Sequence, residues 1–99
     1  MVDPGQNQSE IESVCRRLGV TRLDIFGSAA TGRAKPESDV DVLARFDRSR
    51  GNLFARYFEL KEELERIFGR PVDVVVEDAV RNPYFKQALE QTRRNVFAA

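Results

Sequence analysis

The chain has 99 residues, of which 41% are hydrophobic and 32% are charged, so we expect one compact domain with one hydrophobic core. The 16 basic side chains balance the 16 acidic ones, which excludes the strong positive field of a nonspecific nucleic-acid or anionic-membrane binder. The single cysteine and the lack of histidine exclude a disulfide framework, a zinc site built from several cysteines or histidines, and histidine-based acid–base catalysis.

The sequence carries no signal for membranes or export. Its apolar runs are only a few residues long, and its start lacks the basic and hydrophobic regions of an export signal. We therefore expect a cytoplasmic protein that contacts no membrane and binds no nucleic acid directly. Residues 1–8 are polar and are expected to be a flexible leader, which leaves residues 9–99 as a single domain.

The first expected element is an amphipathic helix over residues 9–18. Ser9 and Glu12 have the spacing of a capping box, and Gly19 is a typical helix stop. The apolar positions of this helix are Ile11, Val14, Cys15 and Leu18. Their helical spacing predicts that they form one buried face, with the cysteine as a core residue.

Two short strands are expected next, separated by a polar loop. Residues 20–26 are rich in β-prone side chains and stop abruptly at Gly27. Residues 39–46 begin with alternating acidic and apolar side chains. Because side chains alternate between the faces of a strand, Asp39 and Asp41 are predicted to project from the same face.

A long amphipathic helix is predicted over residues 52–68, because apolar residues recur there every three or four positions. A valine-rich strand over residues 71–76 follows and is interrupted by Asp73. The tail, residues 83–96, is expected to be a last helix with Pro83 in its first turn. This order predicts a small α/β (α+β) domain in which a short sheet is flanked by helices.

The acidic residues on the predicted strands need a chemical explanation. An ionised carboxylate among valines loses hydration unless it is paired, solvated or bound to a cation. Asp39 and Asp41 can share one or two cations, and a neighbouring strand can bring Asp73 beside them. Oxygen ligands suit magnesium, and two ions about 4 Å apart can hold the attacking and leaving oxygens of a phosphoryl displacement without histidine.

The turn after the first strand suits a phosphate. Gly27 lets backbone N–H groups approach phosphate oxygens, and Ser28 adds a hydroxyl donor. The spacing from Gly27 to Gly32 also fits the start of a Walker loop. Arg33 and Ala34 stand where that loop needs Lys and Ser or Thr, which excludes it.

Together these residues resemble the signature of polymerase-β-type nucleotidyltransferases. That signature is a Gly-Ser pair, a spacer, an Asp-x-Asp pair and, after a long helix, a third acid. The matching positions are Gly27, Ser28, Gly32, residues 38–41 and residues 69–73. The short length and the tail residues 82–85 are similar to minimal nucleotidyltransferase (MNT) proteins, the antitoxin partners of HEPN toxins.

The resemblance implies a small nucleotidyltransferase fold with a short mixed sheet of about three strands flanked by about four helices. It implies that Asp39, Asp41 and Asp73 are the catalytic and metal-binding residues, holding two magnesium ions, and that Asp73 helps to activate the acceptor hydroxyl. The residues implied to bind the donor nucleotide, ATP, are Gly27, Ser28 and Ser38.

Two points stay open within this interpretation. If the register of the third strand differs, Glu77 or Asp78 takes the place of Asp73 as the third acid. Thr31 stands where relatives often carry arginine, a departure that weakens a contact with a phosphate or a partner but leaves the acids intact.

The resemblance also implies a partner, because the chain has no room for the extra helical domain with which larger relatives bind their acceptor. That partner is a HEPN ribonuclease toxin, held in a hetero-oligomer. The toxin would be neutralised by AMPylation, the transfer of AMP from ATP onto one of its hydroxyl groups, by direct binding, or by both. The alternative is a noncatalytic antitoxin that inhibits the toxin by binding alone.

Overall fold

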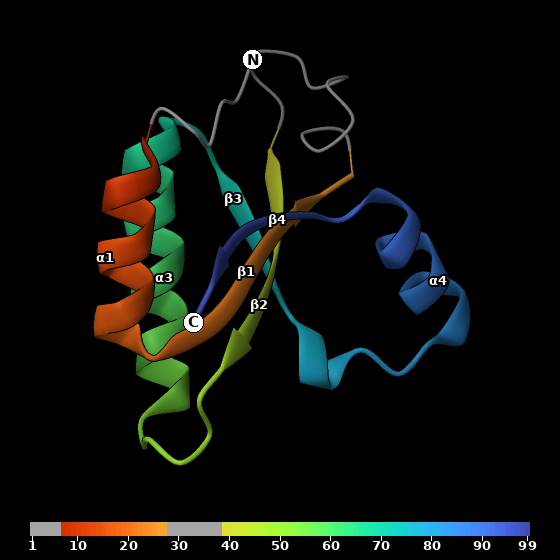
Figure 1. Ribbon diagram of the computed structural model, residues 1–99, viewed down its shortest axis with the longest axis horizontal. Helices are drawn as coiled ribbons and strands as arrows, with labels where there is room; N and C mark the ends of the chain where they lie inside the picture. Colours follow the sequence, from red (N-terminus) through yellow and green to blue (C-terminus); the bar gives the residue numbers. More distant parts are fainter. Residues whose placement is uncertain (1–6, 28–38) are drawn as a thin grey trace.

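The computed structural model describes residues 7–27 and 39–99. Figure 1 shows α1 and α3 on one side of a sheet and α4 on the other. None of the helices in the described ranges has the length and apolar character needed to cross a lipid bilayer. The elements in chain order are α1 (Gln8–Leu18), β1 (Val20–Phe26), β2 (Val40–Phe46), α3 (Leu53–Phe68), β3 (Val72–Val76), the 3₁₀ helix η2 (Glu77–Ala79), α4 (Pro83–Thr92) and β4 (Arg94–Ala98).

The strands form one mixed sheet in the order β3-β2-β1-β4. β1 is antiparallel to both β2 and β4, whereas β2 and β3 are parallel. The parallel pair is connected through α3, as expected because two parallel strands need a crossover connection. Since side chains alternate along a strand, each strand presents one set toward α1 and α3 and the other toward α4.

The main core lies between the sheet and the pair α1 and α3. Leu60 and Leu64 of α3 and Val42 of β2 are fully buried there. Cys15 of α1 belongs to the same core, and its burial raises the pKa of its thiol to about 12. This placement confirms the interpretation of the single cysteine as a packing residue.

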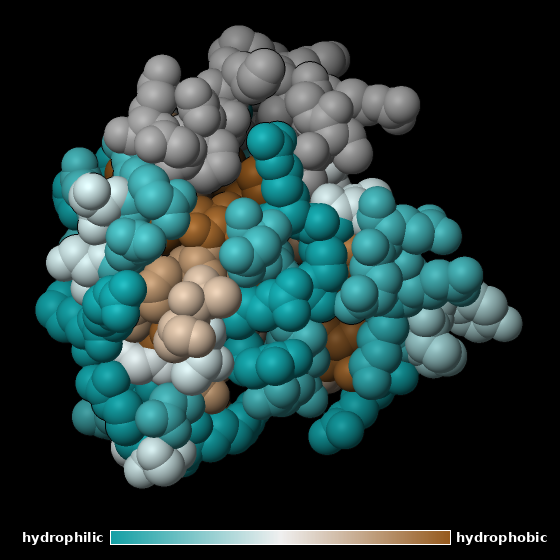
Figure 2. All heavy atoms as spheres, viewed as in Figure 1, coloured by the Kyte–Doolittle hydropathy of each residue, from teal (hydrophilic) through white to brown (hydrophobic). Residues whose placement is uncertain are grey.

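The opposite face of the sheet is only partly covered. Leu43 of β2, Val80 after η2 and Leu89 of α4 form a second, smaller cluster. Phe85 of α4 packs edge-on against Phe26 of β1, with 6.2 Å between the ring centroids. In the view of Figure 2, hydrophilic side chains cover most of the described surface and apolar areas are small.

The structure confirms the α/β class but corrects the start of the first helix. α1 begins at Gln8, with Asn7 at the N-cap position and no side-chain cap hydrogen bond. The capping box predicted at Ser9 is therefore wrong. Nε2 of Gln8 instead donates a hydrogen bond to the carbonyl oxygen of Val96, at 2.7 Å, a tertiary contact that local spacing does not reveal.

The tail needs a second correction. The helix predicted to reach residue 96 ends at Thr92, and β4 then pairs with β1. The described sheet therefore has four strands instead of about three. Val96 and Phe97 of β4 are buried in the main core, and this burial, together with backbone pairing at the β1 edge, outweighs the helical preference of the tail.

Candidate active site

The acidic residues of β2 and β3 meet on the face of the sheet that α1 and α3 leave free. Asp41 is paired with Asp73 in the parallel β2–β3 ladder and with Phe26 in the antiparallel β1–β2 ladder. Val40 and Val42 belong to the main core, so the side chain between them faces the other way. The structure thus brings Asp41 and Asp73 side by side, a placement that the sequence left possible.

The three predicted ligands differ in exposure. Asp39 precedes β2 and is exposed, Asp41 is half-buried, and Asp73 is exposed. Burial, then the charge of Asp73, and then the charge of Asp39 raise the pKa of the Asp41 carboxyl above its usual value. The charges of the two neighbouring carboxylates therefore disfavour ionisation of Asp41.

Gly27 follows the last residue of β1 and lies beside Asp41. Its backbone adopts a left-handed conformation with a φ of 69°, which costs any other residue type strain. A Cβ atom built at this position would lie 3.0 Å from Oδ2 of Asp41. Glycine is therefore needed both for the turn and for the close approach of the backbone to this carboxylate.

The acids have the right chemistry for a hard cation, but they are not preassembled. Their donors are all oxygens. Burial and, after it, the repulsion from Asp73 and Asp39 raise the pKa of Asp41, and a divalent cation relieves that repulsion. Within the two described ranges, however, no three carboxylate or thiol side chains are grouped as a ready-made metal site. An ion that binds here must draw its ligands together.

Part of the predicted nucleotide site lies outside the described residues. This applies to Ser28 and Ser38, and also to Thr31 and Gly32 in the loop between them. Their contacts with a nucleotide stay predictions. Gly27 is the member of the predicted phosphate turn whose place the structure describes.

The alternative third acids lie away from Asp41. The register of the parallel ladder pairs Asp41 with Asp73, near the start of β3. Glu77 and Asp78 instead begin η2, after the far end of β3, and both accept hydrogen bonds from arginine side chains. The geometry therefore places Asp73, and neither alternative, beside Asp41.

Asp24 of β1, which is 0% exposed, was not predicted from the sequence as a residue of structural importance. Its Oδ2 accepts a hydrogen bond from Nε of Arg93 at 2.5 Å, and its Oδ1 accepts one from Nδ2 of Asn95 at 2.8 Å. An acid within a short strand could have signalled the need for a partner. The partners could not be found, because the segment that carries them was predicted to be helical.

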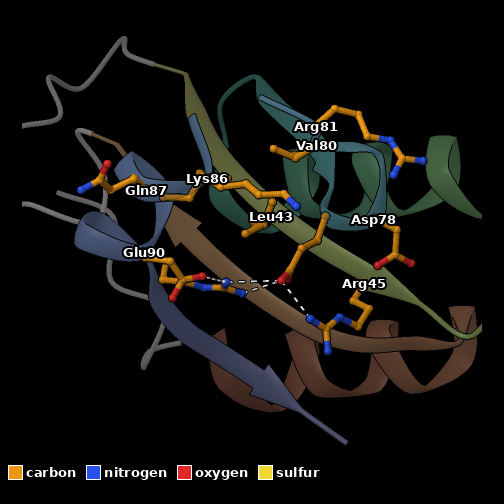
Figure 3. A pocket seen from close by; sticks show the side chains of 11 residues that line it. Leu43, Arg45, Asp78, Val80, Arg81, Lys86, Gln87 and Glu90 are labelled. Carbon is orange, nitrogen blue, oxygen red and sulfur yellow. Dashed lines mark hydrogen bonds and ion pairs between the residues drawn. The ribbon is translucent and has the colours of Figure 1, made fainter. Parts of the chain in front are cut away.

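Arg93 connects this buried acid to two further carboxylates. Its Nη2 is 2.9 Å from Oε1 of Glu77, and its Nη1 is 2.7 Å from Oε1 of Glu90; dashed lines in Figure 3 mark the network around Glu90 and Arg45. Burial opposes the charge of Arg93, but the hydrogen bonds to Glu77, Asp24 and Glu90 outweigh it and raise its pKa. The network anchors the end of α4 to β1 and η2.

The sequence matches the nucleotidyltransferase domain over residues 9–96. A relative in Methanocaldococcus jannaschii, assigned as a protein adenylyltransferase, is 35% identical over 91 residues, covering 84% of this chain and 91% of the relative. The protein adenylyltransferase MntA of Thermococcus cleftensis is 34% identical over 90 residues, covering 83% of this chain and 89% of MntA.

Solved structures share the fold. A protein assigned as a minimal nucleotidyltransferase superposes with a TM-score of 0.73 at 30% identity, covering 94% of this chain and 95% of its own. A chain of the complex between a tri-AMPylated HEPN toxin of Shewanella oneidensis and an MNT antitoxin gives a TM-score of 0.67 at 16% identity, covering 98% of this chain and 74% of its own. The chain described here therefore belongs to the nucleotidyltransferase family, as one of its minimal members.

Proposed function

We propose that this nucleotidyltransferase is a magnesium-dependent protein adenylyltransferase that moves AMP from ATP to a hydroxyl group of a partner protein. One observation carries the proposal: Asp41 lies between the Gly27 turn and Asp73 on the open face of the sheet. This arrangement offers a place for donor phosphates on one side of Asp41 and a second carboxylate, able to serve an acceptor, on the other.

Each residue has a distinct role in this proposal. Asp39 and Asp41 hold magnesium with help from Asp73, and bound magnesium supplies the positive charge that neutralises the phosphates. Asp73, which is exposed, accepts the proton of the acceptor hydroxyl. The backbone of Gly27 approaches the donor phosphates, which Ser28 and Ser38 also bind.

The proposed transfer conserves atoms and charge. The acceptor oxygen forms a bond to the α-phosphorus of ATP, and the bond from that phosphorus to the oxygen bridging the α- and β-phosphates breaks. Pyrophosphate leaves, and the proton of the hydroxyl passes to Asp73. The product is an AMP group attached to the partner through a phosphoester bond.

We further propose that the partner is a HEPN toxin and that the two proteins form a cytoplasmic hetero-oligomer. The complex of a tri-AMPylated HEPN toxin with an MNT antitoxin supports this partner, because one of its chains shares this fold. The relatives are named protein adenylyltransferases, which supports AMP as the transferred group and a protein as the acceptor. AMPylation of the toxin then neutralises it.

A noncatalytic antitoxin that acts by binding alone is the second candidate. It is favoured by one observation: within the described ranges the acids are not grouped as a ready-made metal site. On this alternative the fold serves as a binding surface and the acids have no turnover role. The two candidates differ in whether a covalent product forms.

The position of a radioactive label separates these candidates. The protein and a co-purified partner are incubated with magnesium and with ATP labelled at either the α- or the γ-phosphate, and the partner is then isolated. Adenylyl transfer places the α label, and no γ label, on the partner and requires magnesium. Attachment of the γ label contradicts the proposal, and a partner that binds without acquiring either label supports the noncatalytic candidate.

A further inference from the structure

A pocket of about 500 Å³ lies on the same face of the sheet as the acids, between β2, η2 and α4. Its apolar floor is formed by Leu43, Val80 and Leu89, which are nearly fully buried. In Figure 2 a small brown area is visible between the strands and α4, surrounded by hydrophilic side chains. The size is typical of a site for a small ligand or a few side chains.

The pocket adjoins the candidate active site. Asp41 and Leu43 are two residues apart on β2 and face the same way, so their Cα atoms are about 7 Å apart. A ligand seated on Leu43 can therefore extend a reactive group toward Asp41 and Asp73. The pocket is placed to hold something that takes part in the transfer.

The charges that line the pocket leave a positive excess. All three lining acids are already engaged by arginines: Glu77 by Arg45 and Arg93, Asp78 by Arg48, and Glu90 by Arg93. The side chains of two lining cations, Arg81 and Lys86, make no hydrogen bond or ion pair with any described residue.

Both of these cations border the open space of the pocket. Arg81 lies in the segment between η2 and α4, and Lys86 lies on α4. Figure 3 shows the Lys86 side chain extending past Leu43 and the Arg81 side chain at the other edge of the pocket. An apolar floor with two uncommitted cations is suited to a ligand that is partly apolar and negatively charged.

The pocket chemistry fits the acceptor better than the donor nucleoside. An adenine base is uncharged and gains little from two cations, and the phosphates of the donor belong, on the proposed function, to the Gly27 turn. A protein segment can supply an apolar side chain for the floor and acidic side chains for Arg81 and Lys86.

We infer that this pocket binds the acceptor segment of the partner and selects one in which acidic and apolar residues flank the hydroxyl to be modified. The inference rests on the proposed function, because it presumes a protein acceptor. Ion pairs with exposed cations are individually weak. Two of them together are expected to raise the affinity for an acidic segment about tenfold over a neutral one.

Two fluorescent peptides test this inference without nucleotide. Both contain leucine and tyrosine; one carries glutamates beside the tyrosine, and the other carries glutamines at the same positions. Fluorescence anisotropy measures the affinity of each for the protein, and the glutamate peptide is expected to bind about tenfold more tightly. In the double variant Arg81→Gln/Lys86→Gln this preference disappears, while the affinity for the glutamine peptide is unchanged.

A matched control removes the same charge elsewhere. The double variant Arg17→Gln/Arg66→Gln alters two exposed arginines of α1 and α3 and is expected to keep the preference. Equal affinities for the two peptides, or no detectable binding of either peptide, overturn the inference. So does a preference that survives in Arg81→Gln/Lys86→Gln or is lost in the control. Because no transfer is measured, failure here is distinguishable from failure of the proposed chemistry.

Discussion

Asp41 lies directly opposite Asp73 in the parallel β2–β3 ladder, so two neighbouring strands present like charges on the same face. Cross-strand pairs of this kind are destabilising, and the repulsion contributes to the raised pKa of Asp41. A fold that keeps this pair of carboxylates is less stable than the same fold without it. On the proposed function, the pair is kept because it binds the donor and activates the acceptor.

Neutralising Asp41 should make the metal-free protein more stable. The pKa of Asp41 is raised in the folded state, so ionisation at neutral pH penalises the folded form relative to the unfolded one. Asp41→Asn removes that penalty, and its Tm at neutral pH in a chelating buffer should exceed that of the native protein.

The raised pKa of Asp41 also determines how the Tm difference between Asp41→Asn and the native protein depends on pH. Asp41 of the native protein becomes protonated as the pH falls below its raised folded-state pKa, so the Tm advantage of Asp41→Asn should shrink on acidification. Glu62→Gln, a matched change at an exposed residue of α3, should shift Tm little at any pH. An Asp41→Asn protein less stable than the native one at neutral pH would contradict this reading.

Magnesium with ATP should have the opposite effect on the native protein. A ligand that binds only the folded state stabilises it, by about 2.7 kcal/mol at a concentration 100 times its Kd. Thermal unfolding with and without magnesium and ATP should therefore show a rise in Tm for the native chain and for Glu62→Gln. The rise should be much smaller for Asp41→Asn, and an equal rise would show that Asp41 does not bind the metal–nucleotide complex.

Gly27→Ala should damage both the turn and the site. The left-handed backbone costs an alanine about 1–2 kcal/mol, and the new methyl group would crowd the Asp41 carboxylate. Denaturant unfolding should show the loss of stability. Gly51→Ala is the matched control, because a Cβ atom there meets nothing within 4 Å, and it should leave stability nearly unchanged.

The buried pair of Asp24 and Arg93 should behave as a coupled unit. Arg93→Met leaves a fully buried carboxylate without its main counter-charge and should cost about 3–5 kcal/mol of unfolding free energy. Adding Asp24→Leu removes the stranded charge, so the double variant should be more stable than Arg93→Met alone. Additive losses in denaturant unfolding would show that the two residues are not coupled.

The face of β2 on which Asp41 lies could be predicted from the sequence, because the alternation of side chains along a strand is a local property. The alternating start of β2 set Asp41 on the face away from Val40 and Val42, and the register with β3 then brought in Asp73. That register was only a possibility in the sequence, since a shift of one residue would have turned Asp73 to the other face.

What the sequence could not predict depends on contacts between distant segments. β4 forms because its backbone pairs with the edge of β1. No local pattern in the sequence indicates this pairing. Arg56 of α3 is buried and donates hydrogen bonds to the carbonyl oxygens of Leu18, Asp47, Arg50 and Gly51. The helical pattern alone predicts an ordinary surface arginine at this position, because the hydrogen-bond acceptors lie in α1 and in the loop between β2 and α3.

On the proposed function, the Asp41 carboxylate serves catalysis and not folding. A mass measurement of AMP attached to the co-purified partner tests this role, for the native chain, Asp41→Asn and Glu62→Gln, with the Tm of each protein determined separately in a chelating buffer without ATP. We expect Asp41→Asn to lose transfer while its Tm exceeds that of the native protein, and Glu62→Gln to keep the transfer activity and the Tm of the native protein. Transfer by Asp41→Asn at the native rate would show that the Asp41 carboxylate is not needed for catalysis.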